Sequence, residues 1–158
     1  MNIGFTIGKF APFHDGHKYL INKAINEMDK FYIVVYDTPQ FKIDINTKIK
    51  WIKNEFPDAY ILKAFNSPKQ YGLDNKSVEI QMKYLSKIIK DIPVTHFYSS
   101  EEYGKYVAKY LNIQNVVVDK ERKVYDICAT RIRNDVEKEK KYINTNVYEY
   151  MKRLLISY

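Results

Sequence analysis

The segment that decides the fold reads Gly8-Lys9-Phe10-Ala11-Pro12-Phe13-His14-Asp15-Gly16-His17, and it directly follows an apolar run at residues 3–7. The apolar run predicts a strand, and helical periodicity begins after the segment, so the segment is a strand-to-helix turn. Backbone N–H groups at a helix start attract anions, and two imidazoles three residues apart add donors there. Gly16 lets the backbone approach a ligand closely. We therefore interpret this turn as a candidate phosphate-binding site.

The rest of the chain alternates short apolar runs with amphipathic segments. Further strands are expected at residues 31–36, 59–65, 94–99 and 116–119. Helices are expected at residues 20–28, 49–56, 78–89, 99–111, 129–136 and 147–156. The helix at 99–111 is placed by the capping-box spacing of Ser99 and Glu102. The alternation predicts an α/β fold: a Rossmann-like parallel sheet with helices on both faces, followed by C-terminal helices.

Length and composition indicate an ordinary globular protein. At 158 residues, with 46% hydrophobic and 28% charged residues, we expect a single domain over residues 1–158. Neither an apolar run of membrane-spanning length nor a signal peptide is visible, so we expect a cytoplasmic protein without a membrane partner. The single cysteine, Cys128, fits a reducing compartment.

The formal net charge of +7 raises the question of a nucleic-acid partner. The lysines are spread along the chain, and the 15 tyrosines are scattered, which is more typical of packing than of base stacking. A general positive field also attracts a polyanionic small molecule such as ATP. We therefore expect small-molecule substrates rather than nucleic acid. The sequence leaves open whether the protein forms a homo-oligomer.

Other nucleotide and metal sites lack their signatures. The sequence contains neither the P-loop pattern Gly-x4-Gly-Lys-[Ser/Thr] nor the dinucleotide fingerprint Gly-x-Gly-x-x-Gly. His14 and His17 could ligate zinc, but no cluster of Cys, Asp or Glu completes such a site. The sequence therefore predicts no metal-ligating residue.

The turn resembles the H-x-G-H signature of the nucleotidyltransferase superfamily of adenylyl- and cytidylyltransferases. Its flanks are most similar to nicotinamide mononucleotide (NMN) adenylyltransferases of the NadR type. Three later segments resemble further motifs of that branch in the same order: Ser99-Ser100-Glu101-Glu102-Tyr103-Gly104, Val118-Asp119-Lys120-Glu121-Arg122 and Asp126-Ile127-Cys128-Ala129-Thr130-Arg131-Ile132-Arg133. Each follows an expected strand, and together the resemblance covers residues 4 to about 135.

The resemblance implies roles for individual residues. His14 and His17 would contact phosphates, with His17 stabilising the charge that develops at the α-phosphate, and Lys9 would lie beside them. Arg133 and Thr130 would hold the β- and γ-phosphates. The other implied binding positions are Gly8, Phe10, Gly16, Asp119, Arg122 and Cys128. Cys128 stands where the last of these motifs usually has a serine, and a thiol is a poorer hydrogen-bond donor than a hydroxyl. Arg131 points away from Arg133, and we expect it to be a solvated surface charge.

The acceptor is less clearly indicated than the nucleotide. Members near this branch often stack nicotinamide on a tryptophan, but residues 66–84 contain none, and Tyr71 or Tyr84 could replace it. Residues 66–76 form the least regular segment and are a candidate substrate loop. Trp51 is expected to pack in a helix. Asp37, at a strand end, could serve the substrate or simply form a turn.

The sequence thus predicts a nucleotidyltransferase that transfers AMP from ATP to NMN with Mg²⁺, giving NAD and pyrophosphate. Two alternatives stay open. One is transfer to another acceptor, such as phosphopantetheine, nicotinate mononucleotide or glycerol phosphate, with CTP as a possible donor. The other is a regulatory protein that binds nucleotides without catalysis.

Overall fold

The structure, a computed structural model, describes residues 1–69 and 72–156. Its strands are β1 (Ile3–Gly8), β2 (Lys30–Tyr36), β3 (Tyr60–Ala64), β4 (His96–Ser99) and β5 (Gln114–Val117). Its α-helices are α1 (Asp15–Glu27), α2 (Ile45–Glu55), α3 (Asn75–Ile89), α4 (Gly104–Leu111), α5 (Ala129–Asn134), α6 (Val136–Glu139) and α7 (Thr145–Ile156). Two 3-10 helices, η1 (Pro39–Phe41) and η2 (Lys140–Tyr142), complete the described elements. None of the described helices is long and apolar enough to cross a membrane.

The five strands form one parallel sheet in the order β3-β2-β1-β4-β5. The chain moves outward from β1 to β3, then crosses back to place β4 on the other side of β1. The gap between β1 and β4 is therefore the topological switch point, where sheets of this kind bind ligands beyond the carboxyl ends of their strands. The predicted Rossmann-like parallel sheet is confirmed.

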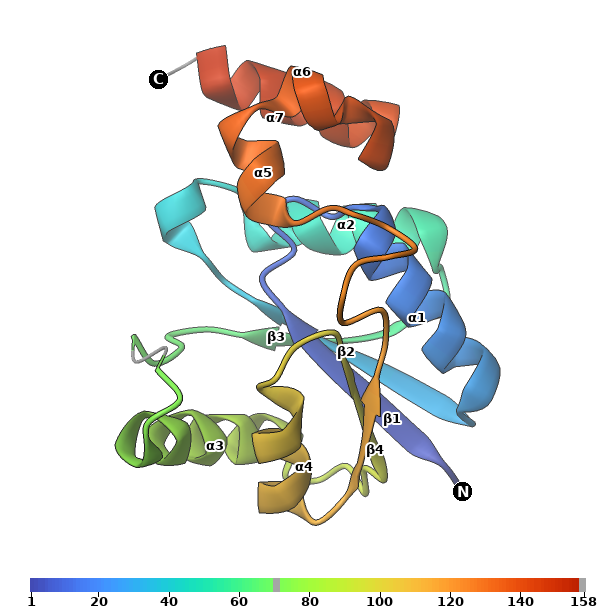
Figure 1. Cartoon of the computed structure of the whole chain (residues 1–158), viewed down its shortest axis with the longest axis vertical. Helices are drawn as coiled ribbons and strands as arrows, with labels where there is room; N and C mark the ends of the chain where they lie inside the picture. The colour runs from blue at the N-terminus through green and yellow to red at the C-terminus, as the bar shows by residue number, and fades with distance from the viewer. Residues whose placement is uncertain (70–71, 157–158) are drawn as a thin grey trace.

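Helices cover both faces of the sheet, so the core has two parts (Figure 1). Successive side chains on a strand point to opposite faces, and Ile33 and Val34 accordingly belong to different apolar clusters. The cluster around Ile33 includes residues of α1, α2 and the C-terminal helices. The cluster around Val34 includes Met82 of α3 and Val107 of α4. Two buried layers hold the strand ends, and the loops that follow them, in place.

The capping box predicted at Ser99 and Glu102 is wrong. Ser99 is the last residue of β4, where pairing with Val117 keeps its backbone extended, and its hydroxyl donates to the carbonyl of Glu101. The helix begins later, at Gly104. A Cβ at Gly104 would lie 2.5 Å from Ser99 Oγ, so glycine allows the helix to pack directly against the strand end.

Two further boundaries differ from the sequence predictions. β5 begins at Gln114 because Gln114 pairs with His96 of β4, and as an edge strand it tolerates polar side chains that hide it in the sequence. The helix expected at 129–136 ends at Asn134. Asp135 then caps α6 by accepting the N–H of Lys138, which splits the expected helix into two short ones.

Candidate active site

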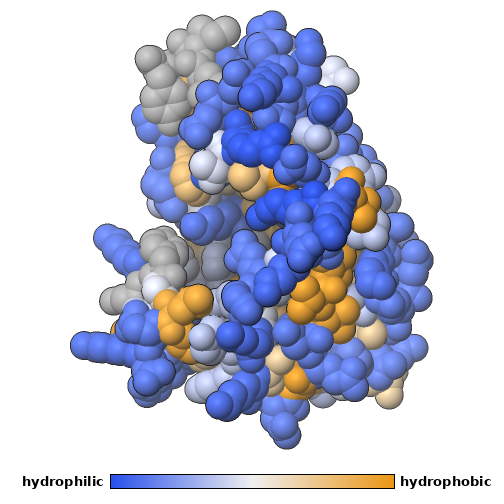
Figure 2. Space-filling view, viewed as in Figure 1, coloured by the Kyte–Doolittle hydropathy of each residue, from blue (hydrophilic) through white to orange (hydrophobic). Residues whose placement is uncertain are grey.

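A cavity of about 750 Å³ lies beyond the carboxyl ends of β1 and β4, at the switch point. Its walls come from the turn after β1, the segments after β4 and β5, the starts of α1 and α5, and parts of α3. Figure 2 shows the surface hollowed on the left of the view, between the C-terminal helices and the α3 side of the molecule. The cavity therefore brings together all four segments that carry the sequence resemblance.

Two glycines allow the turn after β1 to close tightly. Phe10 is buried with a φ of 47°, and its ring lies against Gly8, where a Cβ would come within 2.9 Å of ring carbons. A Cβ at Gly16 would lie 2.9 Å from Cε1 of His14. Contacts that short do not occur in folded proteins without displacement, so both positions need glycine for this turn to form.

The two histidines of the signature cap the first helix reciprocally. His14 is the N-cap of α1, and its Nδ1 accepts the N–H of Gly16 at 3.1 Å. Nδ1 of His17 accepts the N–H of His14, also at 3.1 Å. A neutral imidazole that accepts at Nδ1 carries its proton on Nε2. Both rings line the cavity, so each can offer an Nε2–H donor to a ligand.

Aromatic neighbours hold the two rings rigidly. The imidazoles of His14 and His17 stack with centroids 3.7 Å apart and an interplanar angle of 23°. The ring of His17 is also parallel to that of Phe13, with centroids 5.8 Å apart, and Phe10 approaches it at 4.7 Å. The donors are thus oriented before any ligand arrives, which is the condition for electrostatic stabilisation of a transition state.

Both histidines are neutral. Burial, together with the positive charge of Arg122, lowers the pKa of His14 to about 3. Burial also lowers the pKa of His17 well below its ordinary value, with His14 and Arg122 as additional causes. The site therefore presents uncharged donors near neutral pH, which suits hydrogen bonding to phosphate without proton transfer to it.

Three cationic side chains from separate segments contribute positive charge to the site. Lys9, at the end of β1, is exposed and lies 5.9 Å from the ring centroid of Phe41. Arg122 donates to the carbonyl of Ile127 at 2.5 Å, close to the histidine pair. Arg133, on α5, donates to the carbonyl of Ala11 at 2.6 Å. All three cations line the cavity.

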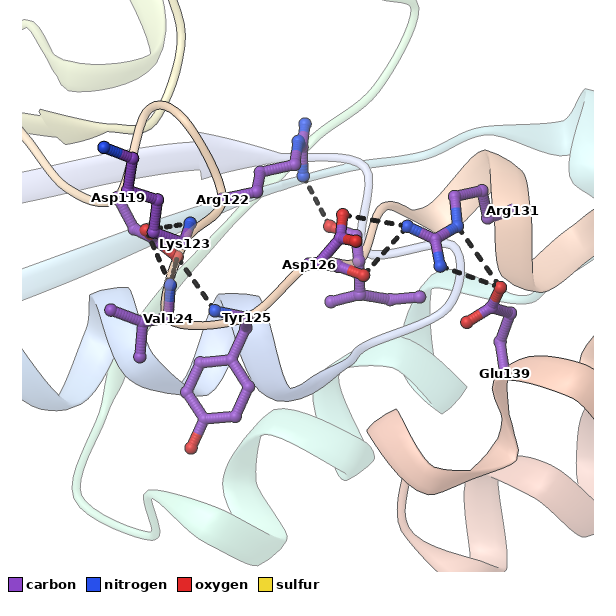
Figure 3. Close-up of polar contacts among 9 residues, drawn as sticks. Asp119, Arg122, Lys123, Val124, Tyr125, Asp126, Arg131 and Glu139 are labelled. Atoms are coloured by element: carbon purple, nitrogen blue, oxygen red, sulfur yellow. Dashed lines mark hydrogen bonds and ion pairs between the residues drawn. The ribbon is translucent and has the colours of Figure 1, made fainter.

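Asp119 and Arg122 organise the segment between β5 and α5 (Figure 3). Both have positive φ, 50° and 53°. The Asp119 carboxylate accepts the backbone N–H groups of Lys123, Val124 and Tyr125. These hydrogen bonds lower the pKa of Asp119 even though partial burial opposes ionisation. Asp119 therefore shapes the loop through the backbone, while its companion Arg122 reaches toward the histidines.

Arg131 is partly exposed, with 41% of its side chain accessible, but it is not the free surface charge that the sequence predicts. Its guanidinium donates to Glu139 at 2.9 and 3.2 Å and to the carbonyl and carboxylate of Asp126 at 2.8 and 3.0 Å (Figure 3). Glu139 is buried, with 4% of its surface exposed. Arg131 thus connects the segment before α5 to α6, a contact that helical spacing alone does not indicate.

The remaining predicted residues have mixed positions. Cys128 and Thr130 line the cavity, with Cys128 as the N-cap of α5 although its thiol makes no capping hydrogen bond. Asp37 is not among the described lining residues, and its N–H pairs with the carbonyl of Ala64. Trp51 is buried and packs edge-on against Tyr150, as predicted. Tyr84 lines the cavity, whereas Tyr71 lies outside the described residues.

Some residues at the site carry no motif and were missed. Tyr36 lines the cavity and meets Tyr84 edge-on at 6.2 Å, and Tyr103, which lies within the motif that follows β4, lines the same cavity. Lys48 is fully buried below the turn after β2, where it donates to the carbonyl of Tyr36 and the hydroxyl of Thr38. A lysine on the same helical face as the buried Ile45 and Ile52 was the available signal for Lys48.

The buried histidine pair predicts a specific acid sensitivity. The unfolded chain protonates His14 near pH 6.5, whereas the folded protein resists protonation down to about pH 3, so stability falls as pH decreases through this window. His14→Asn keeps a capping acceptor without a titrating group. We expect wild type to lose about 1.4 kcal/mol more per pH unit than the variant between pH 6 and 4, measured by urea unfolding. Parallel pH curves would contradict this.

We expect Arg131 to contribute to stability and Arg133 to contribute to ATP binding. Arg131→Ala leaves the buried Glu139 carboxylate unpaired, so we expect a lower melting temperature with ATP affinity close to wild type. Arg133→Ala removes a cavity cation, so we expect weaker ATP affinity with a melting temperature close to wild type. Lys123→Ala, at an exposed pair with Glu121, is the matched control and should change neither quantity. Equal stability of the two arginine variants would refute the role given to Arg131.

Comparison with known proteins agrees with this geometry. Residues 4–151 match the family described as citrate lyase ligase C-terminal domain. The chain is 29% identical over 171 residues to the trifunctional NAD biosynthesis/regulator protein NadR of Salmonella typhimurium, covering 96% of this chain and 41% of that protein. It is 32% identical over 113 residues to phosphopantetheine adenylyltransferase of Mycoplasma mycoides, covering 68% of this chain and 76% of that protein. The chain thus spans less than half of the NadR relative.

Solved structures share the fold. A NadR protein in complex with NAD and AMP-PNP superposes with a TM-score of 0.67 at 22% identity, covering 95% of this chain and 46% of that one. A bifunctional NMN adenylyltransferase/ADP ribose pyrophosphatase from Francisella tularensis gives 0.70 at 17% identity, covering 98% and 49%. The family match covers nearly the whole sequence, so this chain belongs to the citrate lyase ligase C-terminal domain family.

Proposed function

We propose that this protein transfers AMP from ATP to NMN, forming NAD and releasing pyrophosphate. The observation that carries the proposal is the pair of neutral, reciprocally capped histidines in a cavity that Tyr36, Tyr84 and Tyr103 also line. The histidine N–H donors suit phosphates and the tyrosine rings suit an aromatic ring, and both line the same cavity. The similarity to proteins named for NAD biosynthesis supports the same acceptor.

The chemistry needs alignment more than covalent help from the protein. A phosphate oxygen of NMN attacks the α-phosphorus of ATP, a new P–O bond forms, and the bond from the α-phosphorus to the bridging oxygen breaks as pyrophosphate leaves. The Nε2–H donors of His14 and His17 would stabilise the charge that accumulates on the α-phosphate oxygens. Arg133, Thr130 and Lys9 would hold the β- and γ-phosphates, so that the leaving group stays in line with the attack.

Magnesium would enter with the triphosphate. The described residues contain no group of three His, Cys, Asp or Glu side chains arranged to hold a metal ion, and the carboxylate of Asp119 is engaged by backbone N–H groups. Mg²⁺ commonly keeps several waters and binds through substrate phosphates. In this site it would neutralise charge on the triphosphate, while the protein side chains orient the phosphates.

The tyrosine lining of the cavity favours a cationic ring over an acidic one. Burial raises the pKa of Tyr36 and raises that of Tyr103 to about 12, so both present neutral rings and hydroxyls. A pyridinium ring such as that of nicotinamide is attracted to aromatic faces. Among the described lining residues, the acids Glu101 and Glu102 directly precede Tyr103. Their negative charges would disfavour the carboxylate of nicotinate beside this tyrosine.

Phosphopantetheine is a second candidate acceptor, because the chain is 32% identical to a phosphopantetheine adenylyltransferase. Its flexible amide arm could occupy the same cavity. Binding of this arm would not require cations. Among the described residues, the aromatic lining is therefore the one structural feature that favours NMN over phosphopantetheine. Nicotinate mononucleotide and glycerol phosphate have less support from the residues present.

An acceptor panel tests the proposal directly. Pyrophosphate release is measured with ATP or CTP against NMN, nicotinate mononucleotide, phosphopantetheine and glycerol phosphate. We expect ATP with NMN to give the highest kcat/KM and NAD as the product. Highest activity with phosphopantetheine would replace the first candidate by the second, and ATP binding without turnover on any acceptor would indicate a regulatory protein.

The same assay includes His17→Ala as the test of chemistry. Loss of one donor that acts in the transition state costs about 2.7–4 kcal/mol of barrier, a decrease of roughly 10²–10³-fold in kcat. ATP affinity should change much less, because the ground-state triphosphate keeps its other contacts. A kcat within about threefold of wild type, in protein that remains folded, would overturn the role assigned to His17.

Tyr84 should determine affinity for the acceptor ring. Tyr84→Leu removes the aromatic face, and we expect the KM for NMN to rise about tenfold while the KM for ATP stays near wild type. Tyr84→Phe keeps the face and should remain within about threefold of wild type. Tyr110→Leu, at an exposed tyrosine on α4 outside this cavity, is the matched control. Equal KM values for NMN in Tyr84→Leu and wild type would refute this placement of the ring.

A further inference from the structure

Phe41 contacts the cationic part of the cavity without belonging to any recognised motif. It is the last residue of η1, in the connection between β2 and α2. The guanidinium carbon of Arg133 lies 3.9 Å from the centroid of its ring, and Lys9 Nζ lies 5.9 Å from the same centroid. One aromatic ring therefore meets two of the cations assigned to the triphosphate.

The buried side chain of Lys48 holds the connection that carries Phe41 through hydrogen bonds. The Lys48 ammonium donates to the carbonyl of Tyr36 at 2.9 Å and to the hydroxyl of Thr38 at 2.5 Å. The carbonyl of Thr38 then accepts the N–H of Phe41 at 3.0 Å. Lys42 ends η1 with a φ of 57°, which turns the chain back toward α2. The position of the ring is thus set by the fold rather than by exposed side chains.

Arg133 depends on contacts outside its own helix. α5 has six residues, and the contacts of the Arg133 guanidinium reach beyond it. One guanidinium nitrogen donates to Ala11 of the turn after β1, and another contacts the hydroxyl of Thr130 at 3.2 Å. The ring of Phe41 covers one face of the guanidinium. The side chain is therefore oriented jointly by the segments after β1 and β2.

We infer that Phe41 is a positioning residue, which stacks on Arg133 and holds its guanidinium in the orientation that binds the triphosphate of ATP. A free arginine side chain samples many rotamers, and their loss opposes each new hydrogen bond. Stacking on an aromatic face removes most of that freedom before ATP binds and leaves the in-plane N–H donors available. This inference rests on the proposed function only in taking ATP as the ligand.

The test measures MgATP binding by calorimetry in the absence of any acceptor. Phe41→Leu keeps an apolar side chain but removes the aromatic face, and we expect Kd for MgATP to rise about tenfold. Phe41→Tyr restores the face and should bind within about twofold of wild type. Phe65→Leu, at an exposed phenylalanine beyond β3, is the matched control and should leave Kd unchanged. A general packing role would not distinguish tyrosine from leucine in this way.

A double-mutant cycle locates the effect on Arg133. In the Arg133→Ala background, Phe41→Leu should cause no further loss of affinity, because the guanidinium that the ring orients is already absent. Arg133→Lys provides a second variant that leaves Phe41 intact: a lysine lacks the planar face, so its affinity should also fall about tenfold.

The two proposals fail in different ways. If wild type binds no MgATP, the proposed function is overturned. If wild type binds MgATP and Phe41→Leu or Arg133→Lys binds equally well, or if the two losses are additive, the positioning role of Phe41 is overturned while the proposed function stands.

Discussion

The reciprocal capping of α1 by His14 and His17 is the constraint on which the rest of the site depends. Each imidazole satisfies a backbone N–H at the start of the helix and is thereby fixed in one tautomer. Burial keeps both rings neutral. A structural requirement of the helix end thus produces two oriented donors, and the stacked ring of Phe13 keeps them in place. The same two side chains stabilise the start of the helix and line the cavity.

The cavity at the switch point combines two kinds of side chain. Its cations come from α5 and from the segments that follow β1 and β5, whereas Tyr36, Tyr84 and Tyr103 come from β2, α3 and the segment after β4. Charged donors and aromatic rings therefore line one cavity although they come from distant parts of the chain. Under the proposed function, the first kind would bind phosphates and the second would bind the ring of the acceptor.

The C-terminal helices contribute through contacts that cross the fold. Arg131 pairs with the buried Glu139 and holds α5 against α6, while Arg133 reaches back to Ala11 and stacks on Phe41. Two arginines separated by one residue thus have different tasks, one in stability and one at the cavity. The short α5 can present Arg133 because its neighbours on both sides are fixed.

The sequence by itself determined the parallel α/β sheet, the turn after β1 and most of the residues around the cavity, since strand periodicity and the H-x-G-H spacing are local properties of the chain. It did not determine the start of α4, because pairing of Ser99 with Val117 overrides the capping-box spacing. Nor did it indicate Tyr36, Phe41 or the buried Lys48, whose roles come from segments far apart in sequence that meet at the strand ends. Only tertiary structure brings those segments together, because long-range packing decides which side chains face the cavity and which are buried beneath it.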